Sequence, residues 1–322
     1  MFEVEKGIKS ILKAVCVTFK TQEPVLVIAD NEGGPKWIGE LFVDVITSMG
    51  AEVVLTVTTP SEFDGQEPPA SVAAAMKCVN AIFRISDRNS MVHTTARKEA
   101  TAVGARYFTV FQVPVDALKK GVSRADISLI KERTESLVLR LTKASLARVT
   151  TPLGTDITLG LTGRQGLALD PMSPVVSGLP YYAEAAIAPV EGTAQGVIVA
   201  DLAVVGWGYL LREPLRYRVH AGKVVSISGR IEDAKKLRKI AAVEENANNI
   251  AELGIGTSHV VPLPIQGIRN DAARVGTAHI AMGRNDDIGG KTWSNIHLDS
   301  LMDRATVELD GDCVLRDGKL LI

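Results

Sequence analysis

The 322-residue sequence predicts an α/β fold in two domains. Residues 1–140 are expected to form a doubly wound parallel-sheet domain, and residues 141–322 an α+β domain that is mainly antiparallel. Three observations lead to this prediction. Helical and strand-like segments alternate in the first half, short strands with glycine turns fill the second half, and single cores rarely grow beyond about 250–300 residues.

The first half contains short runs of β-branched and aromatic residues separated by segments with helical spacing of apolar positions. The expected strands are 24–30, 51–58, 80–86 and 105–111, and the expected helices are 2–17, 36–50, 69–79 and 89–104. Such alternation is typical of a parallel sheet covered by helices. The Gly33–Gly34 pair in "IADNEGGPKW" lacks the spacing of a nucleotide-binding loop, so we expect a tight β–α turn there.

The second half consists mainly of strand-like segments with Gly and Asp-Gly turns, which are typical of antiparallel hairpins. These segments are 146–164, 196–205, 215–229 and 306–322. One helix is expected over residues 231–254, ending at Gly254. The domain boundary is placed near residue 140, where the alternation ends.

The charge of the chain is balanced, with 36 Lys and Arg against 37 Asp and Glu. A formal net charge of −1 gives no global field that would recruit nucleic acid or an anionic membrane. We see no apolar run that would span a bilayer and no signal-peptide pattern. The three cysteines have no CxxC spacing. Together these features lead us to expect a cytoplasmic protein without disulfide bonds.

Candidate metal ligands are concentrated in the last quarter of the chain. His297 and Asp299 lie two residues apart, so in an extended strand both side chains point to one side. His259, His279 and Glu252 are close in sequence. Two imidazoles and one carboxylate form the pattern of non-haem Fe(II) sites, whereas additional carboxylates favour a two-metal hydrolytic site. We therefore predict that residues 141–322 form a metal-binding catalytic domain. The residues alone leave the non-haem Fe(II) site and the two-metal hydrolytic site as alternatives.

Two further histidines have different contexts. His93 lies where a predicted strand gives way to a helix, at the sheet edge where ligands tend to bind. A capping or surface role is about equally compatible with its position. His220 precedes an Ala-Gly turn, and we expect it to be a surface residue of a hairpin.

Several motifs resemble the superfamily that joins the M29 (thermophilic) metallo-aminopeptidases to the 2,5-dihydroxypyridine 5,6-dioxygenases. They are "GIGTSHVV", "GTAHIAMGRN", "GGKTWSNIHLD", "MVHTTARKEATAVGAR" and "AEAAIAPVEGTAQGVIVAD". The resemblance extends over most of the chain.

The peptidase branch of the superfamily binds two Zn, Co or Mn ions. The resemblance implies that their ligands here would be Glu184, Glu252, His279, His297 and Asp299. The catalytic tyrosine of that branch is missing, because Asp286 stands about where it would be. A metal-dependent aminopeptidase is therefore the alternative prediction.

The dioxygenase branch binds one Fe(II) through two histidines and an aspartate. The resemblance assigns these roles to His259, His297 and Asp299, with His259 as the residue that distinguishes this branch. It also implies that His93 is an acid/base, beside Val92 as a pocket wall. An imidazole with a pKa near its ordinary value is suited to proton transfer.

The main prediction is therefore an Fe(II)-dependent, extradiol-type dioxygenase in aromatic degradation. It would cleave a hydroxylated (N-hetero)aromatic ring, such as a dihydroxypyridine, with O₂. Its partners would be this small aromatic substrate and O₂, without nucleic acid or membrane. The resemblance to the family also implies a homo-oligomer. The expected substrate-binding residues are Val92, His279, Arg284 and Lys291. A non-catalytic binding protein would leave the cluster of His, Asp and Glu unexplained.

Overall fold

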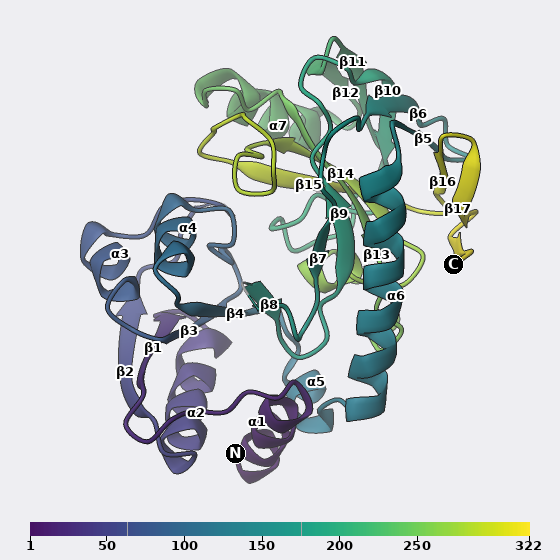
Figure 1. Ribbon diagram of the computed structural model, residues 1–322. Helices are drawn as coiled ribbons and strands as arrows, with labels where there is room; N and C mark the ends of the chain where they lie inside the picture. The colour runs from purple at the N-terminus through teal and green to yellow at the C-terminus, as the bar shows by residue number, and fades with distance from the viewer. Residues whose placement is uncertain (63, 175) are drawn as a thin grey trace. The chain divides into compact units, whose positions relative to one another are not determined.

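The computed structural model describes residues 1–62, 64–174 and 176–322. The chain forms two compact units (Figure 1). Unit 1 contains Met1–Lys131 and Leu169–Tyr182, and unit 2 contains Glu132–Ala168 and Ala183–Ile322. The expected boundary near residue 140 falls inside the long helix α6 (Arg124–Lys143), and it stays a prediction.

Unit 1 is built on a five-stranded parallel sheet with the strand order β2-β1-β3-β4-β8. The strands are β1 (Pro24–Asp30), β2 (Glu52–Thr58), β3 (Ala81–Ser86), β4 (Arg106–Phe111) and β8 (Val176–Gly178). The helices are α1 (Phe2–Ala14), α2 (Gly34–Ser48), α3 (Ala70–Met76), α4 (Thr95–Ala102) and α5 (Val115–Lys120). Every residue of β3 is buried, as expected for a strand covered on both faces.

The predicted parallel sheet is thus confirmed, and so is the turn after its first strand. Gly33 has a φ of 62° directly before α2, a conformation that favours glycine. The Gly33–Gly34 pair therefore forms the tight connection from β1 to α2.

Several elements had no counterpart in the sequence analysis, among them β8 and α6. β8 pairs with β4 through Val176 and Tyr107, although some 65 residues separate the two strands (Figure 1). Its three residues are too few to show a period. Helix α6 does carry a signal, because Ile127, Ile130, Leu137 and Leu141 are fully buried at helical spacing.

Unit 2 contains two antiparallel sheets, which confirms the predicted character of the second half. The eight-stranded sheet has the order β12-β11-β10-β6-β5-β16-β17-β18. Its strands are β5 (Leu146–Thr150), β6 (Asp156–Gly160), β10 (Gln195–Ala200), β11 (Leu215–His220), β12 (Lys223–Ser228), β16 (Thr306–Leu309), β17 (Asp312–Arg316) and β18 (Lys319–Leu320). His220 is exposed beside the Ala221–Gly222 turn of a hairpin, as expected.

The second sheet of unit 2 has five strands in the order β15-β14-β13-β9-β7. These are β7 (Leu167–Leu169), β9 (Glu184–Ile187), β13 (Ile250–Gly256), β14 (Ala278–Gly283) and β15 (His297–Met302). All residues of β9, β13, β14 and β15 are buried.

The prediction of one helix over residues 231–254 is wrong in its second half. Helix α7 (Ile231–Val243) ends at the stretch "EENANN", in which three asparagines have weak helix propensity. Residues 250–256 then form β13, which pairs with β9 on one side and β14 on the other. Tertiary pairing therefore decides the conformation of this segment, and Glu252 lies on a strand.

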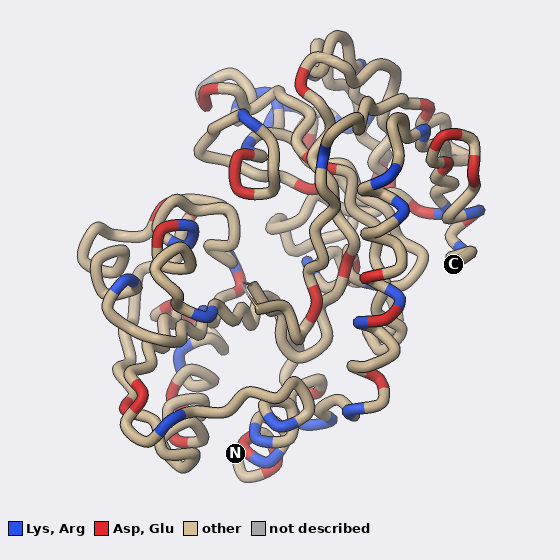
Figure 2. The backbone as a smooth tube through the Cα atoms, in the orientation of Figure 1, with Lys and Arg blue, Asp and Glu red and all other residues tan. Residues whose placement is uncertain are grey.

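Charged residues of both signs are interspersed along both units (Figure 2). Among the described residues, no helix is both long and apolar enough to cross a membrane.

Candidate metal centre

The register of four adjacent strands brings five potential metal ligands to one face of a sheet. Glu252 lies opposite Ala281, which lies opposite Asp299. In the same register His279 is opposite Gly254, His297 is opposite Gly283, and Glu184 is opposite Gly256. Directly opposite residues project to the same face of an antiparallel sheet, and so do residues two apart on one strand. Glu184, Glu252, His279, His297 and Asp299 therefore share a face.

Small residues lie between these side chains and leave room for them. The neighbours on the same face include Ala186, Gly254, Gly256, Ala281 and Gly283. At Gly254 the requirement is strict, because a Cβ atom there would lie 2.2 Å from both Cε1 and Nε2 of His279. The His279 ring therefore occupies the space that any other residue at position 254 would need.

The carboxylate of Glu252 lies between two imidazoles. Nε2 of His297 is 3.1 Å from Oε2 of Glu252 and 3.1 Å from Oδ1 of Asp299. Nε2 of His279 is 3.6 Å from Oε1 of Glu252 and 3.5 Å from Oε2 of Glu184. All five residues are buried, so three carboxylates and two imidazoles are packed together away from water.

One hydrogen bond fixes the orientation of the His297 ring. Its Nδ1 lies 2.7 Å from the backbone carbonyl oxygen of Arg284. Because a carbonyl can only accept, Nδ1 is the donor, and in the neutral ring Nε2 carries the lone pair. That lone pair faces two carboxylate oxygens, which is unfavourable unless a cation or a proton lies between them. Histidines that bind metals commonly have this arrangement.

His279 gives a second indication of a cation. Both of its ring nitrogens are buried and, among the described residues, have no hydrogen-bond partner. An unsatisfied buried polar atom costs about 1–3 kcal/mol of stability. Imidazole nitrogens and carboxylate oxygens are suitable ligands for Fe, Zn and Mn. The side chains of this cluster therefore fit a divalent metal ion.

The electrostatics of the cluster are strongly perturbed. Burial raises the pKa of Glu184 to about 7. Burial also acts to raise the pKa of Glu252, but the adjacent imidazoles of His279 and His297 outweigh it and lower this pKa to about 2. Burial opposes a charge on His279, yet the carboxylates around it, Glu184 foremost, raise its pKa to about 9. Metal ions bind the deprotonated forms of these ligands, so protons and a cation compete for the same atoms.

A family profile described as NicX, 2,5-dihydroxypyridine 5,6-dioxygenase, matches residues 14–322. The chain belongs to this family. Membership confirms the predicted extradiol-type, ring-cleaving dioxygenase, and it implies a metal cofactor, an aromatic substrate and O₂.

The fold has a counterpart among solved structures. The structure of 2,5-dihydroxypyridine dioxygenase from Pseudomonas putida KT2440 superposes with a TM-score of 0.79 at 17% sequence identity, over 99% of this chain and 96% of that chain. A ureidoglycine-glyoxylate aminotransferase from Bacillus subtilis has a TM-score of only 0.24 at 17% identity, over 36% of this chain and 30% of that one. This score is too low to indicate a shared fold. No curated protein matches the sequence.

His259 differs from the five clustered residues in its exposure. His259 lies beyond the end of β13 and is exposed, whereas His297 and Asp299 are buried. In the described part of unit 2, the residues that bring three potential ligand atoms within 4.8 Å of one another are Glu184, Glu252 and His279. His279 shares a face of the sheet with His297 and Asp299. The role of His259 as a metal ligand stays a prediction.

Arg284 and Lys291 are the two cationic residues that were expected to bind the substrate, and the structure shows their surroundings. The guanidinium of Arg284 binds both carboxylate oxygens of Asp286, at 2.5 and 3.2 Å. Lys291 is exposed, and its backbone N–H donates to Glu191. Sequence reasoning missed Arg269, a buried residue whose charge acts to lower the pKa of Glu184. It lies in the 3₁₀ helix η1 (Arg269–Asp271), which is too short to show a periodic signal.

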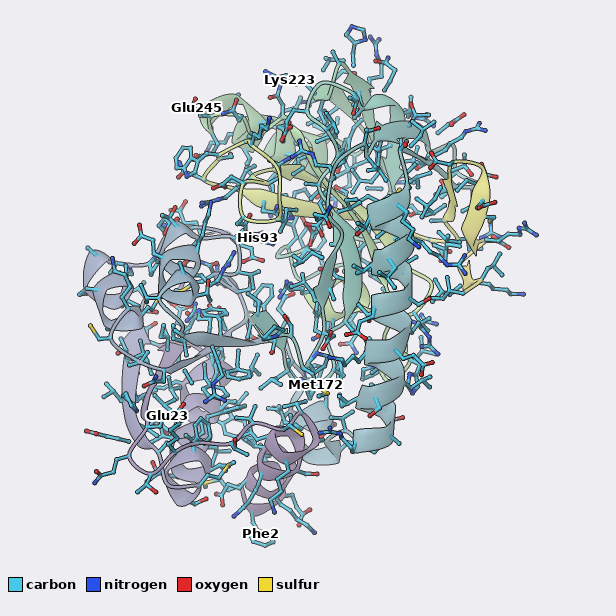
Figure 3. All side chains as sticks on the ribbon, viewed as in Figure 1. Phe2, Glu23, His93, Met172, Lys223 and Glu245 are labelled. Atoms are coloured by element: carbon cyan, nitrogen blue, oxygen red, sulfur yellow. The ribbon has the colours of Figure 1, made fainter. Side chains whose placement is uncertain are left out.

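His93 lies in unit 1 on the segment between β3 and α4 (Figure 3). Val92 precedes it in the chain, and both residues are buried. The segment is held at its start by the buried Arg84, which donates to Asp30 at 2.5 Å and to the carbonyl of Asn89 at 2.9 Å. At its end, Nε of Arg97 donates to the carbonyl of Val92 at 2.6 Å. Their expected roles in the reaction stay predictions.

The contact between Gly254 and His279 generates a testable prediction. In Gly254→Ala the new methyl group would displace the His279 ring, so metal affinity should fall about 10- to 100-fold, as for other changes that misorient a ligand. Equilibrium dialysis against Co(II) measures this. The matched control is Gly34→Ala, where a Cβ meets only ordinary contacts of 3.7 and 3.8 Å. Wild-type Co(II) affinity in a folded Gly254→Ala protein would contradict a role of the His279 ring in metal binding.

Proposed function

We propose that this dioxygenase uses a single non-haem Fe(II) to cleave a hydroxylated (N-hetero)aromatic ring, such as that of a dihydroxypyridine. The observation that carries the proposal is the orientation of His297. Its Nδ1–H is bound to a carbonyl, so its Nε2 lone pair points at Glu252 and Asp299. Two imidazoles with carboxylates are typical ligands of non-haem Fe(II) sites.

The proposed ligands are His279 and His297 as the two imidazoles, together with Glu252 and Asp299 as carboxylates. Glu252 is included because it presents one oxygen to each imidazole. This set retains His297 and Asp299 from the sequence prediction and replaces His259 with His279, which shares their face of the sheet. Glu184, 3.5 Å from His279, would hold that ring in place.

The chemistry that Fe(II) supplies when bound is electron transfer to O₂. In the net reaction, both oxygen atoms enter the product while one ring carbon–carbon bond breaks, so no external reductant is required. The residues of the chain hold the ligands in position, and burial of the cluster keeps bulk water away from the reacting groups. His93 is the proposed group that moves a proton on the substrate hydroxyl.

A two-ion aminopeptidase is the second candidate, because the structure gathers all five residues of that ligand set on one face. The family membership favours the dioxygenase. The number of ions bound per chain separates the two sites, since a two-ion site requires Glu184 as a ligand and the proposed iron site does not.

The ring-cleaving reaction itself is tested by oxygen consumption. After anaerobic loading with Fe(II), the protein should consume one O₂ for each 2,5-dihydroxypyridine that disappears, and it should release no amino acid from aminoacyl anilides. Hydrolysis of the anilides without O₂ uptake would refute the dioxygenase proposal for this chain.

Metal analysis tests the ligands. We expect one tightly bound Fe(II) or Co(II) per chain, lost in His279→Ala because the second imidazole is removed. The ion should be retained in His259→Ala, because that side chain is exposed beyond the end of β13. Elemental analysis after desalting gives the stoichiometry. Loss of the ion in His259→Ala with retention in His279→Ala would restore the ligand set predicted from the sequence. Two ions, one of them lost in Glu184→Ala, would favour the two-ion site.

The role of His93 predicts a separation of binding and turnover. His93→Ala should bind the same amount of metal as the wild type, while turnover falls about 100- to 10,000-fold because a general acid/base is lost. His220→Ala is the matched control, since His220 is an exposed strand residue of the other unit. Unchanged turnover in His93→Ala would remove this residue from the mechanism.

A further inference from the structure

The orientation of His297 depends on one carbonyl group, which lies in an irregular connection. Arg284 follows the last residue of β14, and residues 284–296 run from there to His297 at the start of β15. The carbonyl oxygen of Arg284 accepts from Nδ1 of His297 at 2.7 Å. Whatever fixes the direction of this carbonyl also fixes the imidazole that we propose to bind the metal.

The direction of that carbonyl is set by the next residue, Asn285. The C=O of residue 284 and the N–H of residue 285 belong to one planar peptide group and point in opposite directions. The Asn285 N–H donates to the carbonyl of Thr292 at 3.0 Å. Holding this N–H in place therefore holds the Arg284 carbonyl toward His297.

Asn285 is fully buried, and its own side chain is held from two sides. Its Oδ1 accepts from the Thr292 N–H at 2.8 Å, and its Nδ2 donates to Oε1 of Glu191 at 3.1 Å. A Cβ atom at Gly290 would lie 2.1–2.4 Å from the amide atoms of Asn285. The connection thus has a glycine where the amide group of Asn285 needs the space.

Glu191 links Asn285, near the start of the connection, to Lys291 in its middle. Its Oε1 accepts from the side chain of Asn285 and also from the backbone N–H of Lys291, at 2.7 Å. Its other oxygen pairs with Arg164, which in turn donates to the carbonyl of Gly289 at 2.5 Å. Burial acts to raise the pKa of Glu191, but the hydrogen bonds and Arg164 lower it, so the carboxylate stays ionised at neutral pH.

We propose that Asn285, braced by Glu191 and Arg164, is a positioning residue that orients the Nδ1–H of His297 through the Arg284 peptide. None of these three side chains belongs to the proposed ligand set. The proposal deepens the proposed function, on which its metal-binding consequence rests, and its contribution to ring orientation is independent of any metal.

The first experiment measures ring orientation without metal. In protein labelled with ¹⁵N-histidine, the Nδ1–H proton of His297 should be protected from solvent exchange, and His297→Gln assigns its signal. In Asn285→Ala this proton should exchange at least about tenfold faster, because the hydrogen bond to Arg284 is weakened. Equal protection in a folded Asn285→Ala protein would overturn the proposal.

The second experiment measures the metal. Asn285→Ala should weaken Co(II) binding about 10- to 100-fold and alter the visible Co(II) spectrum. Glu191→Ala should have a smaller effect in the same direction, and Glu191→Gln should restore most of the affinity, because its amide oxygen can still accept. Wild-type affinity and spectrum in Asn285→Ala would also overturn the proposal.

Two controls separate a positioning role from general destabilisation. Asn295→Ala removes another asparagine of the same connection, whose Nδ2 donates to Glu244 at 2.8 Å, and it should match the wild type in both experiments. Circular dichroism and thermal unfolding confirm that each variant is folded. If the wild type binds no Co(II), the proposed metal function fails, and the exchange measurement alone decides the role of Asn285.

Discussion

The register of strands β9, β13, β14 and β15 places three carboxylates and two imidazoles in one buried space, and the other features of the site serve to keep them there. Buried charges are costly unless they are paired. Here Glu252 is paired on both sides, with His279 and with His297. A slip of one residue in any of these strands would turn its ligand to the opposite face.

This constraint also explains the composition of the sheet around the site. Glycine and alanine are poor strand residues, yet they occupy the positions between the clustered carboxylates and imidazoles. At Gly254 the reason is direct, because the His279 ring fills the space of a side chain. The sheet thus has residues of low strand propensity at the positions where the clustered side chains need room.

The sequence was sufficient to predict the fold class and to single out part of the candidate site. Strands β1 to β4 are apolar runs between helices, so their sequence pattern was sufficient to predict them. Strand β8 is too short to show such a pattern. The pair His297 and Asp299 was recognisable from its spacing alone. Glu252 was assigned to a helix because residues 250–254 also fit helical spacing, and only pairing with β9 and β14 reveals a strand. His279 is buried and His259 is exposed, a difference that motif resemblance does not contain.

The late return of the chain to unit 1 through β8 has a consequence for biosynthesis. During translation, the parallel sheet of unit 1 cannot be completed until Gly178 has left the ribosome, after residues 132–168 of unit 2 have already emerged. Until then β4 is an open sheet edge that could pair with other chains. An N-terminal fragment that ends near residue 140 would keep this edge unpaired permanently. The two units alternate along the chain, so a single cut cannot separate them.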